Sequence, residues 1–129
     1  MQAIVRARGF VLPDRIRSSE LYKDTEYTKI INDISNVQTG DIVGLCPLDK
    51  TDFWGIHVGI IWIDDTDTTY VVHNAKHTGA LQRERIEDAL KHERHNKIAW
   101  IKRPIVKNNK LSNPQGLDII GLGYLTKHI

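Results

Sequence analysis

The sequence predicts an α+β domain in which an antiparallel sheet of four or five strands packs against one or two helices. Runs of apolar and β-branched residues alternate with turn residues along the chain, as in a meander of strands. One amphipathic stretch follows these runs and predicts a helix. The 129 residues, with 40% hydrophobic and 26% charged residues, are typical of a single globular domain, so we expect residues 1–129 to form one unit.

The first third of the chain carries the weakest signals. Residues 1–8 favour a helical turn or a short frayed strand, and Gly9 and Pro13 interrupt whatever forms there. Residues 14–27 are rich in charges and predict a loop with one helical turn. Residues 29–37 favour neither helix nor strand, so the regular sheet is expected to begin after them.

Three segments in the middle of the chain predict the centre of the sheet. A turn ending in Asp41 precedes a strand at residues 42–46, and Pro47 ends this strand because proline has no N–H to donate. Residues 56–63 predict a second strand that is covered on both faces, because apolar residues occupy both its odd and its even positions. After an acidic turn, residues 68–74 predict the returning strand.

The second half of the chain predicts a helix and a final strand. Residues 82–94 are expected to be helical because Ile86, Ala89 and Leu90 fall on one stripe among charged residues. Residues 97–103 predict a strand that stops at Pro104. Residues 105–129 then form a C-terminal extension whose apolar residues are candidates for packing on the sheet, on a second copy of the chain or on a partner chain. These residues are Leu117, Ile119, Ile120, Leu122 and Leu125.

Composition excludes several classes of function. The net charge of +2 and the mixing of acidic with basic residues argue against a nucleic-acid partner. No apolar run is long enough to span a membrane, so no membrane association is expected. The N-terminus lacks the apolar core of a signal peptide, which predicts a cytoplasmic location for the chain as given, or the cell envelope if it is a fragment of an exported protein.

Two histidines in the central strands are the candidate functional residues. His57 lies in Gly-Ile-His-Val-Gly-Ile-Ile-Trp-Ile and His73 in Tyr-Val-Val-His-Asn-Ala, on strands expected to pair through the acidic turn. Both histidines then lie near one end of the hairpin, and Gly59 leaves room on the face of His57. A base oriented by a second polar side chain is the arrangement that activates a nucleophile. The alternative is a purely structural role, in which the two histidines lie in the core and each forms hydrogen bonds with the backbone.

The order of these motifs resembles the NlpC-type papain-like cell-wall hydrolases. Thr39-Gly40-Asp41-Ile42-Val43 resembles the strand that opens their core sheet, and His57-Val58-Gly59-Ile60 resembles the strand with their catalytic histidine. Val71-Val72-His73-Asn74-Ala75 resembles their next strand, and Ile98-Ala99-Trp100-Ile101-Lys102-Arg103-Pro104 a later strand that ends in Arg-Pro in the N-acetylmuramoyl-L-alanine amidase-like branch. The resemblance covers residues 12–104.

The resemblance implies a papain-like core, which is a half-barrel sheet packed against a helix. It implies that His57 is the general base and His73 its orienting residue, and that a peptide or peptidoglycan-like amide is the substrate. It implies no cofactor. The chain differs from the family in one respect, because no cysteine precedes Gly40 where the family places its nucleophile.

Cys46 is the only cysteine of the chain, and it is therefore the candidate nucleophile within it. It ends one predicted strand where His57 begins the next, so the two ends of a hairpin could bring the thiol to the imidazole. Alternatively, Cys46 is a small buried hydrophobic residue. A missing segment or a partner chain would then supply the thiol, and the serines at positions 18, 19 and 35 lack a nucleophile signature.

Two other functional classes remain open. The first is a non-catalytic module of the same fold, in which the cleft binds a peptide or a protein without chemistry. The second is a zinc site made by His57, His73 and His77, which we disfavour because His73 and His77 would need helical geometry to share a face. The sequence therefore predicts no metal and leaves enzymatic activity undecided.

Overall fold

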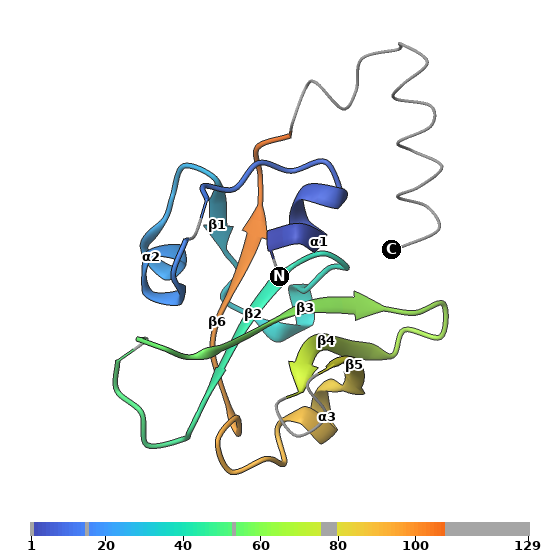
Figure 1. Cartoon of the computed structure of the whole chain (residues 1–129). Helices are drawn as coiled ribbons and strands as arrows, with labels where there is room; N and C mark the ends of the chain where they lie inside the picture. The colour runs from blue at the N-terminus through green and yellow to red at the C-terminus, as the bar shows by residue number, and fades with distance from the viewer. Residues whose placement is uncertain (1, 15, 53, 76–79, 108–129) are drawn as a thin grey trace.

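The computed structural model describes residues 2–14, 16–52, 54–75 and 80–107. Its centre is a six-stranded antiparallel open sheet with the strand order β1-β6-β2-β3-β4-β5. Strands β3 and β4 run across the direction of β2 and β6, so the sheet is strongly twisted (Figure 1). The strands are β1 (Thr28–Ile30), β2 (Ile42–Cys46), β3 (His57–Ile63), β4 (Thr69–Ala75), β5 (Ala80–Arg85) and β6 (Lys97–Pro104).

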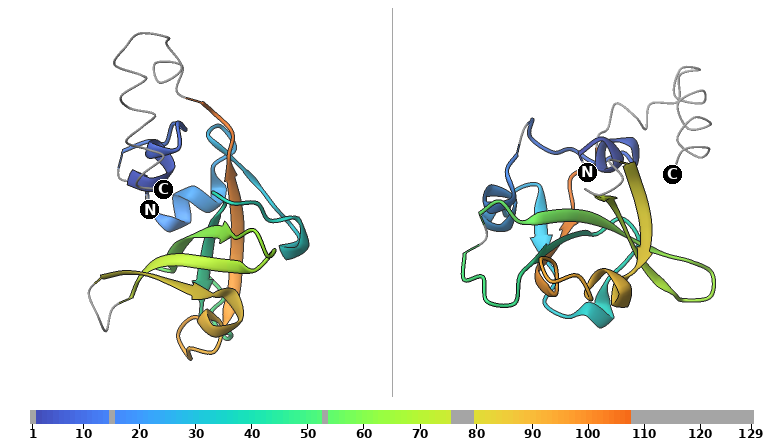
Figure 2. Two further views of the ribbon diagram at one scale, coloured as in Figure 1. Left: turned by 90° about the vertical axis from the view of Figure 1, so that its right-hand side faces the viewer. Right: turned by 60° about the horizontal axis from the view of Figure 1, so that its bottom comes forward.

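Short helices cover both faces of the sheet. Helix α1 (Gln2–Ala7) lies to the right of β6 and α2 (Ser18–Lys23) to its left, whereas α3 (Ile86–Ala89) lies beside β4 and β5 (Figure 1). A single 3₁₀ turn, η1 (Ile34–Asn36), precedes β2. Figure 2 shows from two further sides that α1 and α2 share one side of the sheet. Within the described ranges, no helix has the length and apolar character needed to cross a bilayer.

Strand alternation sorts the buried side chains into two cores. The first core packs α1 and α2 on one face of the sheet, and the second packs α3 on the other. The first core consists of Val5, Leu12, Leu21, Ile42, Cys46, Ile56, Ile60 and Trp100. The second core consists of Val37, Val43, Leu45, Ile61, Val71, Ile86, Ala89 and Ile101. Both faces of β2 are therefore covered, which explains why all five of its residues are buried.

A buried ion pair joins the start of β2 to the end of β6. Arg103 donates from Nε to Asp41 Oδ1 at 2.8 Å and from Nη2 to Asp41 Oδ2 at 2.9 Å. The same carboxylate accepts the backbone N–H of Gln38 at 2.8 Å, so it also fixes the turn before β2. The hydrogen bonds to Asp41 raise the pKa of the Arg103 guanidinium although burial opposes its charge. This pair holds the two central strands in register.

The structure confirms the α+β class and the antiparallel sheet and corrects two of the predicted elements. The predicted strands at residues 42–46, 56–63, 68–74 and 97–103 are present as β2, β3, β4 and β6. The predicted helix at residues 82–94 is wrong for most of its length, because residues up to Arg85 form strand β5 and α3 is a single turn. With β1 added at the other edge, the sheet has six strands rather than four or five.

We expect Asp41→Asn to lower the free energy of unfolding by about 2–4 kcal/mol, because it leaves Arg103 without its charged partner inside the protein. Urea denaturation followed by circular dichroism measures this change. Asp14→Asn is the matched control. Asp14 accepts from Arg6 at 2.6 Å in an exposed pair, so its substitution should change the free energy of unfolding little. Equal effects of the two substitutions would contradict the assigned role of the Asp41–Arg103 pair.

Candidate functional site

The imidazoles of His57 and His73 meet at the end of the β3–β4 hairpin. The distance between His57 Nε2 and His73 Nδ1 is 2.7 Å, which is a hydrogen bond, and the ring planes are nearly perpendicular at 81°. His73 is only 4% exposed, whereas His57, at the start of β3, is half-buried. The two histidines that the sequence places at one end of a hairpin therefore lie on the same face and in contact.

Gly59 makes this contact possible because it has no side chain. A Cβ atom at Gly59 would lie 2.6 Å from Val71 Cγ1, 3.1 Å from the Val72 carbonyl oxygen and 3.2 Å from His73 Cβ. The first of these separations is well below any normal contact between carbon atoms. Glycine at this position thus lets the His73 segment of β4 approach β3 closely enough for the two rings to join.

A carboxylate extends the pair into a chain of three groups. Glu84 lies on β5, opposite Val71 of β4, and its Oε1 is 2.9 Å from His73 Nε2. Burial opposes the charge of Glu84, but hydrogen bonds from His73 and His92, and the positive charge that these rings can carry, outweigh it and lower the pKa of the carboxyl. Glu84 is therefore an ionised acceptor at neutral pH.

The ionised carboxylate determines where the protons lie on the two neutral imidazoles. Because Glu84 only accepts, His73 must donate through Nε2–H, and a neutral His73 then has its lone pair on Nδ1. This Nδ1 accepts from His57 Nε2–H across the 2.7 Å hydrogen bond. The basic lone pair of neutral His57 is consequently on Nδ1, and a proton taken up there is stabilised through His73 by the negative charge of Glu84.

Two further histidines contact this series of hydrogen-bonded residues. His92 Nε2 is 3.3 Å from Glu84 Oε2, and its side chain is half exposed. The His95 ring stacks on the His57 ring with a centroid distance of 4.2 Å and an interplanar angle of 16°. Stacking restricts rotation of the half-buried His57 ring, so His95 helps to fix its orientation.

An open cavity of about 460 Å³ lies beside His57. Its polar side chains are all basic, since Lys50 and Arg94 join His57 and His95 in lining it. Asp52 offsets part of this charge, because its carboxylate lies 3.3 Å from Lys50 Nζ at the surface. The cavity therefore favours a ligand with a negatively charged group near the His57 ring.

Cys46 lies on the opposite face of the sheet from His57. Leu45 pairs directly with His57 and therefore shares its face, and Cys46 is the next residue along β2. Its side chain is 1% exposed and packs in the first core with Ile42 and Ile60. The expected approach of the thiol to the imidazole at the end of the hairpin is thus wrong, because strand alternation separates the two groups.

The described residues contain no cluster of three or more metal-ligating side chains arranged to hold an ion. His57 and His73 turn ring nitrogens toward each other instead of toward a common centre. His77, the third residue of the zinc alternative, lies outside the described residues. The extension at residues 105–129 is described only as far as Lys107.

Sequence reasoning missed Glu84 and His95 as members of the site. Glu84 lies within the helix expected at residues 82–94, where it is one of several surface charges, and His95 directly follows that helix. The sequence carries no signal for strand β5, because the inward-facing Gln82 and Glu84 are polar and the outward-facing Leu81 is apolar. Comparisons of the chain with models of protein families, with curated proteins and with solved structures gave no match.

We expect Gly59→Ala to destabilise the protein by about 1–3 kcal/mol, because the added methyl group overlaps Val71 and the backbone of β4. It should also shift the ring resonances of His57 and His73 in NMR spectra, since the strands must separate at this point. Gly55→Ala is the control, because a Cβ at Gly55 meets nothing within 4 Å and only its positive φ of 64° opposes the change. Unchanged histidine spectra in Gly59→Ala would contradict the close approach.

We expect Glu84→Gln to lower the free energy of unfolding at neutral pH by about 1–2 kcal/mol, through loss of the charged hydrogen bonds to His73 and His92. The pKa of Glu84 is lower in the folded than in the unfolded chain, so its contribution is complete above the ordinary value of 4.5 and disappears as the pH falls through the lower folded value. Urea denaturation at a series of pH values measures the difference between the two proteins. A difference that grows as the pH falls below 4.5 would contradict this assignment.

Proposed function

We propose that this chain has a papain-like amidase or peptidase fold and that His57 is the general base of a thiol-dependent amide hydrolysis. The hydrogen-bonded chain from His57 through His73 to Glu84 carries this proposal. A base held by a second group, which is itself held by a carboxylate, is the arrangement that activates nucleophiles in hydrolases on unrelated folds. The ordered motifs that resemble the NlpC-type hydrolases support the same conclusion.

In the proposed reaction, His57 Nδ1 takes the proton of a thiol and the thiolate attacks the amide carbonyl of the substrate. The imidazolium then donates this proton to the leaving amine, and an acyl thioester forms as the C–N bond breaks. Water, deprotonated by the same Nδ1, hydrolyses the thioester and regenerates the thiol. His73 and Glu84 act as positioning residues that hold the His57 ring and stabilise its positive charge.

The thiol in this reaction comes from a partner chain or a further segment of the protein rather than from Cys46. Cys46 is buried in the first core on the far face of the sheet, where a substrate at the His57 cavity could not reach it. His57 and the cavity beside it are then one half of a shared active site.

The basic lining of the His57 cavity supports an amide substrate that carries a carboxylate. Lys50 and Arg94 can bind such a group while the scissile carbonyl lies near the His57 ring. Peptides of the peptidoglycan type, with free carboxylates close to their amide bonds, have this chemistry. Neutral peptides would offer no charged group to these two cations.

A non-catalytic binding module is the second candidate. The burial of Cys46, the only thiol of the chain, is the observation that favours it. In this case the cavity binds an anionic peptide through Lys50 and Arg94, and the histidine chain only shapes the site.

Hydrolysis of p-nitrophenyl acetate separates the two candidates, because this activated ester reacts with a basic imidazole without a thiol. We expect His57→Ala to lower the rate at neutral pH by at least about tenfold, below the full effect of general-base catalysis because no thiol takes part. Cys46→Ala is the control and should react like the unmodified protein. The release of p-nitrophenolate is followed by its absorbance.

A rate that does not depend on His57 would overturn the base role. If the protein then still binds an acidic peptide, and Arg94→Gln weakens this binding, the non-catalytic module is the better account. A rate that falls equally in Cys46→Ala and His57→Ala would contradict the placement of the thiol on the far face.

A further inference from the structure

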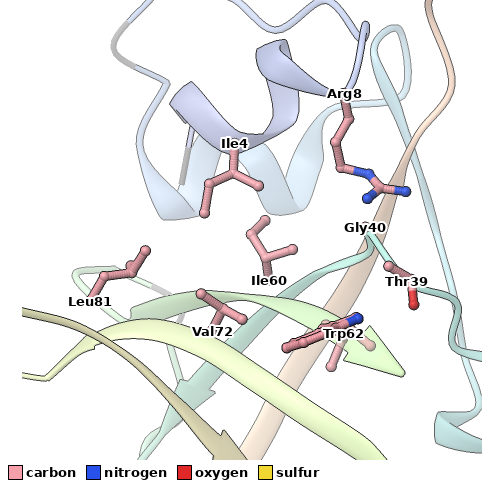
Figure 3. A pocket seen from close by; sticks show the side chains of 9 residues that line it. Ile4, Arg8, Thr39, Gly40, Ile60, Trp62, Val72 and Leu81 are labelled. Atoms are coloured by element: carbon pink, nitrogen blue, oxygen red, sulfur yellow. The ribbon is translucent and has the colours of Figure 1, made fainter. Parts of the chain in front are cut away.

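A second cavity lies on the opposite face of the sheet from His57 and His73, between α1 and strands β3, β4 and β5 (Figure 3). Its volume is about 340 Å³, which falls within the range of about 300–1,000 Å³ that small-molecule sites occupy. Ile60, Trp62 and Val72 form its floor, because they alternate with the residues that face the histidines. This cavity is therefore separate from the proposed active site.

The walls of this cavity are apolar except at one end. Ile4 of α1 faces Ile60 and Val72 across it, and Leu81 lies at the far end (Figure 3). The backbone groups of the strands below are engaged in the sheet, and Thr39 Oγ1 is bonded to Ile63 N at 2.9 Å. A peptide in this groove would bring amide groups that need partners, whereas an alkyl chain needs none.

Arg8 provides the polar end of the cavity. Its guanidinium turns toward Gly40 and Thr39 at the end opposite Leu81 (Figure 3). Arg8 Nε is buried and has no hydrogen-bond partner, although it lies so close to Gly40 that a Cβ there would be 2.9 Å away. A buried donor without a partner is unfavourable by about 1–3 kcal/mol, and native proteins rarely leave one unless a ligand or water satisfies it.

We propose that this groove binds a single-chain amphiphile with an anionic head, and specifically a free medium-chain carboxylate. The carboxylate accepts hydrogen bonds from the Arg8 guanidinium, including the buried Nε–H, and the alkyl chain lies along Ile60 and Val72 toward Leu81. The charge complementarity at one end and the apolar walls elsewhere match the two halves of such a molecule. The site is independent of the proposed hydrolase function.

Isothermal titration calorimetry of the full chain with monomeric decanoate at neutral pH tests this proposal. We expect decanoate to bind, decan-1-ol to bind more weakly, and Arg8→Gln to weaken decanoate binding by at least about tenfold through loss of the charged hydrogen bonds. Arg8→Lys should restore part of the affinity. Arg85→Gln is the matched control, since Arg85 is an exposed arginine of β5 that does not line the groove.

Val72→Trp provides a second variant that leaves Arg8 in place, because the larger side chain fills the groove and should abolish binding of both ligands. No binding of decanoate to the unmodified chain, or equal binding by the Arg8→Gln and unmodified chains, would overturn the proposal. Binding that appears only after Leu122→Asp would also overturn it, since the C-terminal segment of the chain would then be the natural occupant.

Discussion

The candidate site depends on the hydrogen bond between the imidazoles of His57 and His73. Gly59 leaves the space that Val71 and His73 occupy beside this bond, because a side chain at Gly59 would overlap both residues. The contact fixes one ring against the other, and Glu84 then fixes the second ring from β5. Two hydrogen bonds thereby join three residues from three separate strands into one hydrogen-bonded unit.

The alternation of side chains along the strands gives the two faces of the sheet different contents. The face covered by α3 holds the histidines, Glu84 and a basic cavity, whereas the face covered by α1 and α2 holds Cys46, the first core and the apolar groove beside Arg8. Because Leu45 and Cys46 are consecutive on β2, the thiol and the His57 imidazole cannot share a face. The same periodicity that builds the site also excludes the only cysteine from it.

The central strands could be predicted from the sequence because their side chains follow the usual chemistry of a buried sheet. The runs that form β2, β3, β4 and β6 are apolar and β-branched, and the hairpin that two of them predict places His57 and His73 near one end. Strand β5 could not be predicted, because polar residues of this strand face the protein and an apolar residue faces outward, the reverse of the usual pattern. Gln82 and Glu84 turn toward the protein whereas Leu81 is 60% exposed.

Two further errors have the same physical origin. The expected helix includes Glu84 because the sequence does not predict strand β5, and the expected site therefore lacks its carboxylate. The ends of β2 and β3 predict that Cys46 lies near His57, but the two side chains take opposite faces of the sheet. The pairing of strands in the folded sheet determines that Glu84 belongs to a strand and which face Cys46 takes. Local sequence signals alone do not specify this pairing.

Long-range ¹H–¹⁵N correlation spectra of the histidine rings, recorded at a pH where both rings are neutral, test the central claim most directly. The hydrogen-bonded chain requires the proton on Nε2 of His73 and on Nε2 of His57, with unprotonated Nδ1 atoms on both rings. A neutral His57 that carries its proton on Nδ1 would contradict it, because its Nε2 would then accept from His73 and the lone pair required for the base would be used within the site.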